Sequence, residues 1–192
     1  MRGIKMLKGE LVRLREYKQS DVELAYRYLN DPEVMLNLSN GIPYPMTLEK
    51  EQEWFNSQNK NQDKYSFAIE TLNDKVYIGG CGINWYDWKN GTAEVGIFIG
   101  DKRYRGKGYG TDAMKVLINF LFQHTNINRI QLATYSFNER AIKSYLKCGF
   151  KEEGRLRQRV FRHGKYHDEI LMGLLREDYN KILKKSMDKS DQ

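Results

Sequence analysis

The sequence is poor in cysteine and proline, and it contains no long apolar run. Its 192 residues include two cysteines and three prolines. Two thiols, Cys81 and Cys148, are too few for a disulfide framework or a cysteine-based metal cluster, which favours a reducing compartment such as the cytoplasm. No apolar stretch approaches the roughly 20 residues that cross a membrane, and the first residues lack the apolar core of a signal peptide. These absences favour a cytoplasmic protein with no membrane partner.

Positive charge is in excess, with a formal net charge of +7 at pH 7. A basic protein can bind nucleic acid, but these basic residues are spread along the chain, which disfavours a nucleic-acid partner. Two groups stand out: Lys102, Arg103, Arg105 and Lys107, and then Arg155, Arg157, Arg159 and Arg162. The first group suits a ligand with several negative charges. The near-alternation of the second predicts one face of a strand.

The length predicts a single domain with a sizeable core. We place this domain at residues 7–183, after an N-terminal extension at 1–6 that contains the alternative start Met6. A polar tail at 184–192 is expected to fray.

Apolar patterning predicts strands with helices interspersed. The predicted strands cover residues 11–15, 65–70, 76–85, 92–99 and 129–135, and two more turn at His163–Gly164. The predicted helices cover 20–30, 47–58, a segment around 113–121, and 139–147. We expect a capping box at Ser20–Glu23, a break at Asp31–Pro32, a loop at 41–45 and a left-handed terminator at Gly149. This order implies an α/β (α+β) protein built on a central mixed sheet.

The stretch from Arg105 to Thr111 contains three glycines and follows the apolar run at 95–99. Glycines let the backbone curl with its N–H groups pointing inward, and the next helix adds free N–H groups and positive potential. Strand, glycine turn and helix together favour a phosphate-binding site.

Two common phosphate loops do not fit this stretch. A Walker loop needs Ser or Thr after its lysine, but Lys107 is followed by Gly108. A dinucleotide fingerprint needs a later third glycine than Gly110 and an acidic residue about twenty positions on, and residues 126–132 contain no Asp or Glu. A nucleotide-dependent enzyme of another class is therefore disfavoured.

A different family matches two ordered motifs. Arg105, Gly108 and Gly110 form Arg-x-x-Gly-x-Gly, and residues 138–150 form Asn-x-x-Ala-x-x-x-Tyr-x-x-x-Gly-Phe. Together they resemble the GCN5-related N-acetyltransferases, over roughly residues 7–180. The resemblance implies a mostly antiparallel mixed sheet, splayed between its fourth and fifth strands and flanked by helices. It also implies acetyl transfer from acetyl-coenzyme A to a primary amine, by direct attack in a ternary complex and without a metal.

The resemblance implies a set of coenzyme-binding residues. They are Ile97, Phe98, Ile99, Arg105, Gly106, Lys107, Gly108, Tyr109, Gly110, Thr111 and Asn138. At 97–99 the main chain would hold the pantetheine arm, while the side chains could simply pack in a core. Asn138 could equally be a helix cap, with Ser136 and Glu139 as a rival cap.

Tyr145 and Glu94 are the candidate catalytic residues. Tyr145 would hydrogen-bond the departing thiolate, or it is a core tyrosine. Because a phenol is a weaker acid than a thiol by about 2 kcal/mol, a hydrogen bond is favoured over full proton transfer. Glu94 would assist the amine, or it is a solvated strand residue. A carboxylate is a poor base for an alkylammonium, by roughly 8 kcal/mol, so a water relay would be needed. Other candidate acids are Glu33, Glu153 and Asp168.

Several residues remain open. The two cysteines could form an acyl-cysteine, but packed thiols are favoured. His163 and His167 flank a turn and are expected at the surface rather than on a metal. Trp85, Tyr86 and Trp88 could pack or line the acceptor pocket.

The opening at 9–15 and the ending at 154–168 resemble the branch of ribosomal-protein N-terminal and spermidine acetyltransferases. This branch implies a homodimer and leaves the acceptor open among a protein α-amine, polyamine, amino sugar and antibiotic. A non-catalytic acyl-coenzyme A binding or sensing module is the alternative function.

Overall fold

The fold is seen in a computed structural model that describes residues 5–58 and 65–190. The strands are β1 (Val12–Arg15), β2 (Ser66–Thr71), β3 (Tyr77–Asp87), β4 (Thr92–Ile99), β5 (Arg129–Tyr135), β6 (Lys151–Arg162) and β7 (Lys165–Leu175). The α-helices are α1 (Val22–Leu29), α2 (Pro32–Leu38), α3 (Leu48–Gln58), α4 (Tyr109–His124), α5 (Glu139–Lys147) and α6 (Arg176–Ser190). Short 3-10 turns lie at η1 (Lys5–Leu7), η2 (Gln19–Asp21) and η3 (Lys102–Tyr104).

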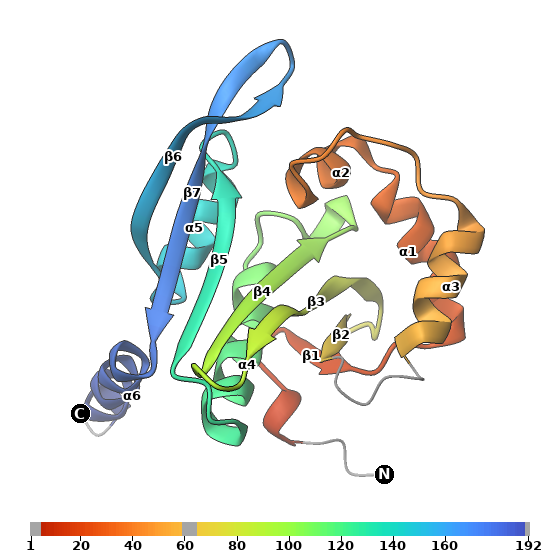
Figure 1. Cartoon of the computed structure of the whole chain (residues 1–192). Coiled ribbons are helices and arrows are strands. Elements are labelled where there is room, and N and C mark those ends of the chain that lie inside the picture. Colours follow the sequence, from red (N-terminus) through yellow and green to blue (C-terminus); the bar gives the residue numbers. More distant parts are fainter. Residues whose placement is uncertain (1–4, 59–64, 191–192) are drawn as a thin grey trace. The chain divides into compact units, whose positions relative to one another are not determined.

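The described strands form a seven-stranded sheet in the order β1-β2-β3-β4-β5-β7-β6 (Figure 1). β4 and β5 pair in parallel, whereas β1–β2, β2–β3, β5–β7 and β6–β7 are antiparallel. The predicted mixed and mostly antiparallel sheet is confirmed. Three elements have the predicted bounds: β4, β5 and α5.

The chain divides into two compact units, and each is described by itself. The first contains the described residues of Met1–Ile83 and Gly96–Leu117, and the second those of Asn84–Val95 and Ile118–Gln192. The boundary passes through β3, β4 and α4, so these elements contribute to both units.

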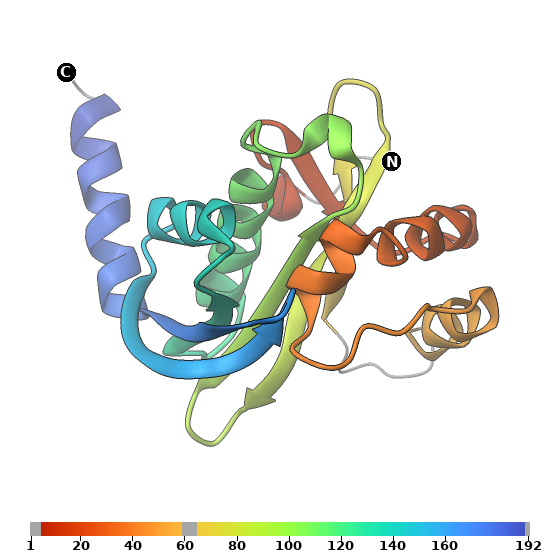
Figure 2. The ribbon, with the colours of Figure 1, turned by 90° about the horizontal axis from the view of Figure 1, so that it is seen from above.

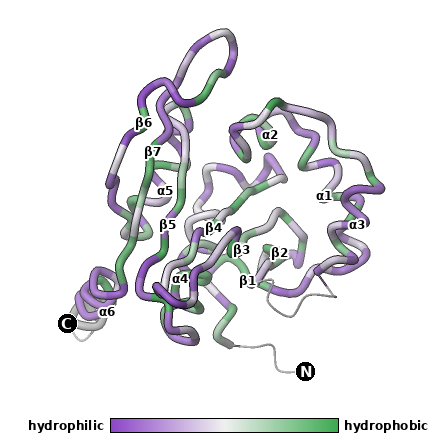
Figure 3. The backbone as a smooth tube through the Cα atoms, viewed as in Figure 1, coloured by the Kyte–Doolittle hydropathy of each residue, from purple (hydrophilic) through white to green (hydrophobic). Residues whose placement is uncertain are grey.

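In the first unit, α1 and α3 lie side by side (Figure 1). Ala25 of α1 packs with Ala68 of β2 and Tyr77 of β3, and Tyr17 and Tyr28 cover this cluster. Figure 3 shows apolar residues along β3 and β4 and polar residues along much of α3. Part of the core of this unit is therefore formed by side chains packed between α1 and strands β2 and β3.

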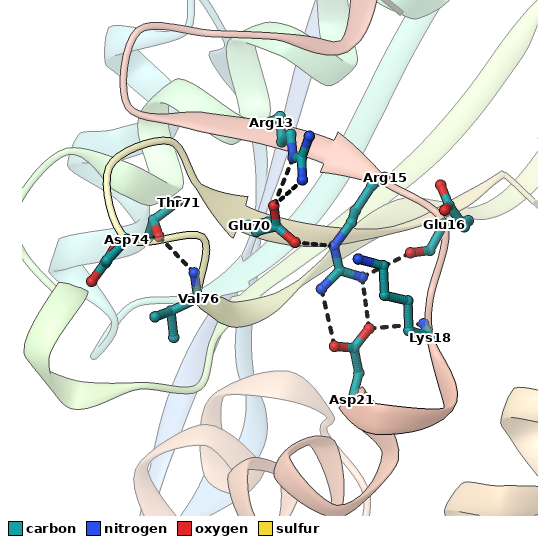
Figure 4. A network of polar contacts seen from close by, with 9 residues as sticks. All are labelled: Arg13, Arg15, Glu16, Lys18, Asp21, Glu70, Thr71, Asp74 and Val76. Carbon is teal, nitrogen blue, oxygen red and sulfur yellow. Dashed lines mark hydrogen bonds and ion pairs between the residues drawn. The ribbon is translucent and has the colours of Figure 1, made fainter. Parts of the chain in front are cut away.

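A buried charge network replaces the predicted capping box at Ser20–Glu23. The guanidinium of Arg15 donates to Asp21 Oδ2 at 2.7 Å and to Glu70 Oε2 at 2.5 Å (Figure 4). Asp21 Oδ2 also accepts the N–H of Lys18 at 2.8 Å. The prediction was wrong because Asp21, which precedes α1, uses its carboxylate to pair Arg15 and makes no side-chain cap on α1.

Asp31 and Pro32 follow the end of α1 and begin α2, a helix that was not predicted. Asp31 is the N-cap of α2, where its carboxylate accepts the N–H of Glu33 at 3.1 Å, and Pro32 occupies the first turn. Asp and Pro at these two positions are a common helix start. The segment is therefore a helix–helix corner.

In the second unit, β5 pairs with β7, and β7 pairs with β6 in a long hairpin (Figures 1 and 2). The hairpin turns at His163 and Gly164, whose φ values are +50° and +73°, as predicted. α5 contacts β5 and ends at Gly149, with φ +96°. The N–H of Phe150 bonds the carbonyl of Tyr145 at 3.1 Å. The predicted left-handed terminator is confirmed.

The predicted single face of arginines on β6 is wrong. The strand shifts register between Leu156 and Val160, and Gln158 has a φ of +54°. This bulge interrupts the alternation, so Arg162 is buried whereas Arg155, Arg157 and Arg159 are exposed.

Helix α6 continues through the polar segment that begins at Lys184, as far as Ser190. Residues 1–4 of the predicted extension and residues 191–192 of the predicted tail lie outside the described residues. Within the described ranges, no helix combines the length and apolar character needed to span a membrane. The boundaries of the single domain stay a prediction.

Candidate functional site

The glycine turn in the first unit connects the end of β4 to the start of α4. Gly106 and Gly108 have φ values of +72° and +90°, which L side chains rarely adopt. A Cβ on Gly106 would meet no atom within 4 Å, so open space surrounds this position. Lys107, between the two glycines, is exposed. The turn therefore presents its backbone and one lysine ammonium to solvent, as a phosphate ligand requires.

Helix α4 begins inside this turn, at Tyr109. The N–H groups of a first helical turn have no partner within the helix. One of them, on Asp112, bonds the carbonyl of Gly108 at 2.9 Å. The N–H groups of Tyr109, Gly110 and Thr111 lie at the positive end of the helix dipole. These geometric features fit the pyrophosphate of a coenzyme.

The guanidinium of Arg105 is turned into the protein. It donates to the carbonyl of Ile99 at 2.9 Å and to that of Gly100 at 2.5 Å. It also pairs Asp31 at 2.7 Å and Glu33 at 2.8 Å. The side chain is only 6% exposed. Two carboxylates thus compensate its charge, and its evident role is to fix the turn rather than to offer a free cation.

Asp31 and Glu33 were missed as partners of the loop. Burial alone would raise the pKa of Asp31, but hydrogen bonds from Arg105 and the Glu33 N–H, with the Arg105 charge, lower it below its ordinary value. The carboxyl group of Asp31 is therefore ionised at neutral pH and forms an ion pair with Arg105. Its distance of 74 positions from Arg105 in the sequence left no local signal.

Asp112 fixes the other end of the turn to β1. Its carboxylate accepts the N–H groups of Leu11 at 2.8 Å and Val12 at 3.0 Å. A Cβ at Gly9 would come within 2.4 Å of the same carboxylate. Glycine at position 9 leaves the room for this contact, which anchors the first turn of α4.

Asn138 in the second unit is the N-cap of α5. Its Oδ1 accepts the N–H of Ala141 at 3.2 Å. Within residues 5–58 and 65–190, its Nδ2 donates to no protein acceptor. The rival cap is wrong, because Ser136 Oγ instead accepts the N–H of Asp168 at 3.1 Å. Asn138 therefore caps the helix and keeps an amide donor free for a ligand.

Tyr145 lies near the C-terminal end of the same helix, α5, and is buried. Its ring packs against Phe150 with centroids 5.9 Å apart. Burial, with a smaller contribution from Cys148, raises the pKa of Tyr145 to about 12. In the described part of the chain its hydroxyl has no hydrogen-bond partner, and it is not among the fully enclosed polar atoms. The phenol is thus a neutral donor with no internal acceptor.

Glu94 lies on β4 and pairs in register with Gln131 of β5. It is half-buried, and its carboxylate makes no ion pair or hydrogen bond with the described residues. The three other candidate acids are all engaged. Glu33 pairs Arg105, Glu153 pairs Arg129, and Asp168 accepts from the Gln158 N–H and from Arg155.

The ladder between β4 and β5 covers three residue pairs and ends at Glu94 and Gln131. β4 continues to Ile99 and β5 to Tyr135. Residues 100–104, which include η3, separate the predicted main-chain ligands at 97–99 from the glycine turn, and Arg105 donates to the carbonyl of Ile99.

A cavity of about 300 Å³ opens within the second unit at Glu94. Its lining includes Arg129, Gln131 and Ala133 of β5, Glu153 of β6 and Leu171 of β7. Glu94 and Glu153 were predicted as separate candidate acids, whereas Arg129 and Gln131 were not predicted. Arg129 and Gln131 are two positions apart on a predicted strand, so the sequence could have predicted that both side chains lie on the same face.

The remaining candidates are packing or surface residues. Both cysteines are buried thiols outside any disulfide, and burial raises the pKa of the Cys81 thiol, so the packed-thiol interpretation is confirmed. His167 packs edge-on against Phe137 at 4.8 Å. Tyr86 and Trp88 pack together at 4.5 Å, while Trp85 is exposed. The described residues include no group of three or more His, Cys, Asp or Glu arranged to hold a metal.

Comparisons with known proteins agree with this geometry. The family model for an acetyltransferase (GNAT) domain matches residues 12–151. The prophage-derived N-acetyltransferase YokL of Bacillus subtilis is 29% identical over 171 residues, which cover 89% of this chain and 93% of that protein. The spermidine N(1)-acetyltransferase of Escherichia coli is 27% identical over 168 residues, 88% of each chain. A spermidine N-acetyltransferase structure from Vibrio cholerae with CoA and spermine is 25% identical, with a TM-score of 0.78 over 88% of this chain and 97% of that one.

Proposed function

Because the chain belongs to the GNAT acetyltransferase family and is an acetyl-coenzyme A-dependent N-acetyltransferase, we propose that it acetylates a primary amine by direct attack in a ternary complex. The two relatives named for spermidine acetylation, one of them solved with CoA, support an amine acceptor and a coenzyme A thioester donor. The observation that carries the proposal is on α5, where the Asn138 Nδ2 and the Tyr145 hydroxyl each have no hydrogen-bond acceptor among the described residues.

In this proposal the first unit holds the phosphates of the donor. The N–H groups of the turn and the start of α4 bind them, with the ammonium of Lys107 nearby. Main-chain groups of Ile97, Phe98 and Ile99 hold the pantetheine arm. The side chain of Arg105 acts by fixing this backbone, which preorganises the N–H groups.

Tyr145 stabilises the departing thiolate with a hydrogen bond. A phenol of pKa about 12 is a weaker acid than a thiol of pKa about 8.5, so full proton transfer is uphill by roughly 5 kcal/mol. A hydrogen bond to the developing negative charge avoids that cost. Because burial raises the pKa of Tyr145, its hydroxyl donates a hydrogen bond to the thiolate and keeps its proton.

Glu94 attracts the acceptor ammonium and assists its deprotonation, directly or through water. Its carboxylate makes no ion pair with the part of the chain that the structure describes, which supports this role, because a carboxylate already paired to arginine would attract a cation less. A water relay fits the large difference between the acidities of a carboxylic acid and an alkylammonium.

The test is release of free coenzyme A thiol with a panel of amines, including a peptide N-terminus, a polyamine and an amino sugar. We expect thiol release that depends on one class of amine and an acetylated product of matching mass. Coenzyme binding without release for any amine would replace the proposal with the acyl-coenzyme A binding or sensing module. The homodimer also stays a prediction, which light scattering of the purified protein would test.

A further inference from the structure

The cavity beside Glu94 has an ordered polar lining on one face of the second unit's strands. Glu94 is opposite Gln131 in the register, and Gln131 is opposite Gly173 of β7. Arg129, Gln131 and Ala133 alternate along β5 and therefore point to the same side. All three line the cavity together with Glu94.

The arginine in this lining is already neutralised. Arg129 Nη1 donates to Glu153 Oε1 at 2.9 Å, and its Nη2 donates to Glu153 Oε2 at 2.5 Å. Glu153 can reach this position because residue 173 is glycine, where a Cβ would come within 2.4 Å of the carboxylate oxygens. Glu94 is left as the uncompensated charge of the lining, so the cavity suits a ligand with one positive charge.

The amide of Gln131 has a defined orientation. Arg129 Nε, which can only donate, is 3.2 Å from Gln131 Oε1. The Gln131 oxygen therefore faces Arg129, and its NH₂ group points elsewhere. Among the described residues this NH₂ group has no acceptor. The cavity thus places a free hydrogen-bond donor on the strand next to the free carboxylate of Glu94.

Ala133 and Leu171 supply an apolar part of the lining. They are opposite each other in the β5–β7 register, and Leu171 is 37% exposed. At about 300 Å³ the cavity is at the lower end of the range for ligand sites. It can hold the end of a chain rather than a large rigid molecule.

We propose that this cavity selects, as acceptor, a primary amine whose neighbouring carbon carries a carbonyl group, as at the N-terminus of a peptide. The ammonium meets Glu94, the carbonyl oxygen accepts from Gln131 Nε2, and the first side chain lies against Ala133 and Leu171. Gln131 is the residue that determines this specificity. The inference rests on the proposed function for its reaction, but the recognition itself is a binding property.

A polyamine fits this lining less well. It has several ammonium groups and no oxygen, so it would leave the Gln131 NH₂ without an acceptor. Its further positive charges would find no second uncompensated carboxylate in the lining. The chemistry of the lining therefore differs from what the names of the spermidine-acetylating relatives suggest.

The experiment uses L-alaninamide and isopropylamine, which differ only in a carboxamide that replaces a methyl group. Binding of each to the full chain at pH 6.5, where both are ammonium ions, is followed by NMR titration. The variant is Gln131→Leu, which removes the donor, and the matched control is Gln52→Leu on α3. Glu94→Gln is added because it should weaken both ligands alike.

We expect Gln131→Leu to weaken L-alaninamide about five- to tenfold, as one lost hydrogen bond does, and to leave isopropylamine within twofold. Gln52→Leu should change neither. Equal effects of Gln131→Leu on both ligands, or none, would overturn the inference. Selective binding without thiol release for any amine would leave the inference standing and remove the proposed function, so the two failures are distinguishable.

Discussion

Arg105 and Asp31 form an ion pair of 2.7 Å that joins the glycine turn to the N-cap of α2. The same guanidinium donates to the carbonyl groups of Ile99 and Gly100 at the end of β4. One buried side chain thus connects a strand end, a helix start and the proposed phosphate site. In this chain, the arginine of the motif therefore contacts carbonyl and carboxylate groups of the protein itself.

Replacing Arg105 tests this bracing role. Arg105→Lys keeps the charge but cannot make four directed contacts from one planar group. We expect a loss of roughly 2 kcal/mol in the free energy of unfolding and about tenfold weaker binding of acetyl-coenzyme A. Arg103→Lys is the control, because Arg103 is 73% exposed and its ion pair among the described residues is with Asp101, two positions before it. Calorimetry and denaturant unfolding measure both quantities. If Arg105→Lys is less stable but binds acetyl-coenzyme A as tightly as wild type, Arg105 contributes to stability and not to coenzyme binding.

The glycine turn is tested by Gly108→Asp. This change puts a side chain and a negative charge where phosphate is expected, so acetyl-coenzyme A affinity should fall more than tenfold. Gly164→Asp in the β6–β7 turn is a matched control, because Gly164 has a similar positive φ of +73° and open space around it. Calorimetric titration of both variants separates backbone strain from loss of the site. Equal affinity in Gly108→Asp and wild type would rule out the phosphate assignment.

Glu70 makes the stability of the first unit depend on pH. Burial would raise its pKa, but hydrogen bonds and charge from Arg15 and Arg13 lower it below the ordinary value of 4.5. A lowered pKa in the folded state gives stability that is complete above the unfolded pKa and is lost as pH falls through the folded one. Glu70→Gln should therefore cost roughly 3 kcal/mol at pH 7 and less near pH 3. Urea unfolding across pH tests this, with the exposed Glu23→Gln as control, and a constant difference would contradict it.

The predictable part of the fold came from local patterns. Period-two and period-3.6 apolar spacing predicted β4, β5 and α5, and Gly149 predicted the end of α5, because these signals act within a few residues. The capping-box prediction was wrong because the carboxylate of Asp21 pairs with Arg15. Helix α2 was not predicted because an Asp–Pro pair can either end a helix or begin one.

The site shows the same division. The motifs predicted the turn, Asn138 and Tyr145 as candidates, but not what each side chain contacts. Arg105 was expected to offer its charge to phosphate, yet Asp31 and Glu33, which pair with it, are distant in sequence. Gln131 became a candidate only when the register placed it opposite Glu94. Long-range pairing of charges and strands has no local signature, so sequence patterns could not reveal it.

Tyr145 is expected to act on turnover rather than on coenzyme binding. Tyr145→Phe keeps the ring against Phe150 and removes the hydroxyl. Turnover should fall roughly ten- to a thousandfold, with little change in acetyl-coenzyme A affinity. Since the pKa of Tyr145 is raised to about 12, its hydroxyl stays protonated and the defect should be flat from pH 6 to 9. Tyr179→Phe, which removes a hydroxyl bonded to Asn119, is the control. If a folded Tyr145→Phe variant turns over as fast as wild type, the Tyr145 hydroxyl has no catalytic role and the residue serves in packing alone.

Glu94 is expected to matter most where the acceptor amine is protonated. An ammonium must lose a proton before it attacks, and Glu94 is the candidate acid whose carboxylate makes no ion pair with any described residue. Glu94→Gln should therefore lower the rate most at low pH, and the defect should shrink as pH approaches the amine's own pKa. A role limited to attracting positive charge would instead raise KM at every pH where the amine is charged, with kcat unchanged. Initial rates over a pH series separate these outcomes, with Glu139→Gln on the exposed face of α5 as control. Rates equal to wild type throughout would remove Glu94 from the mechanism, because no part of the deprotonation would then depend on its charge.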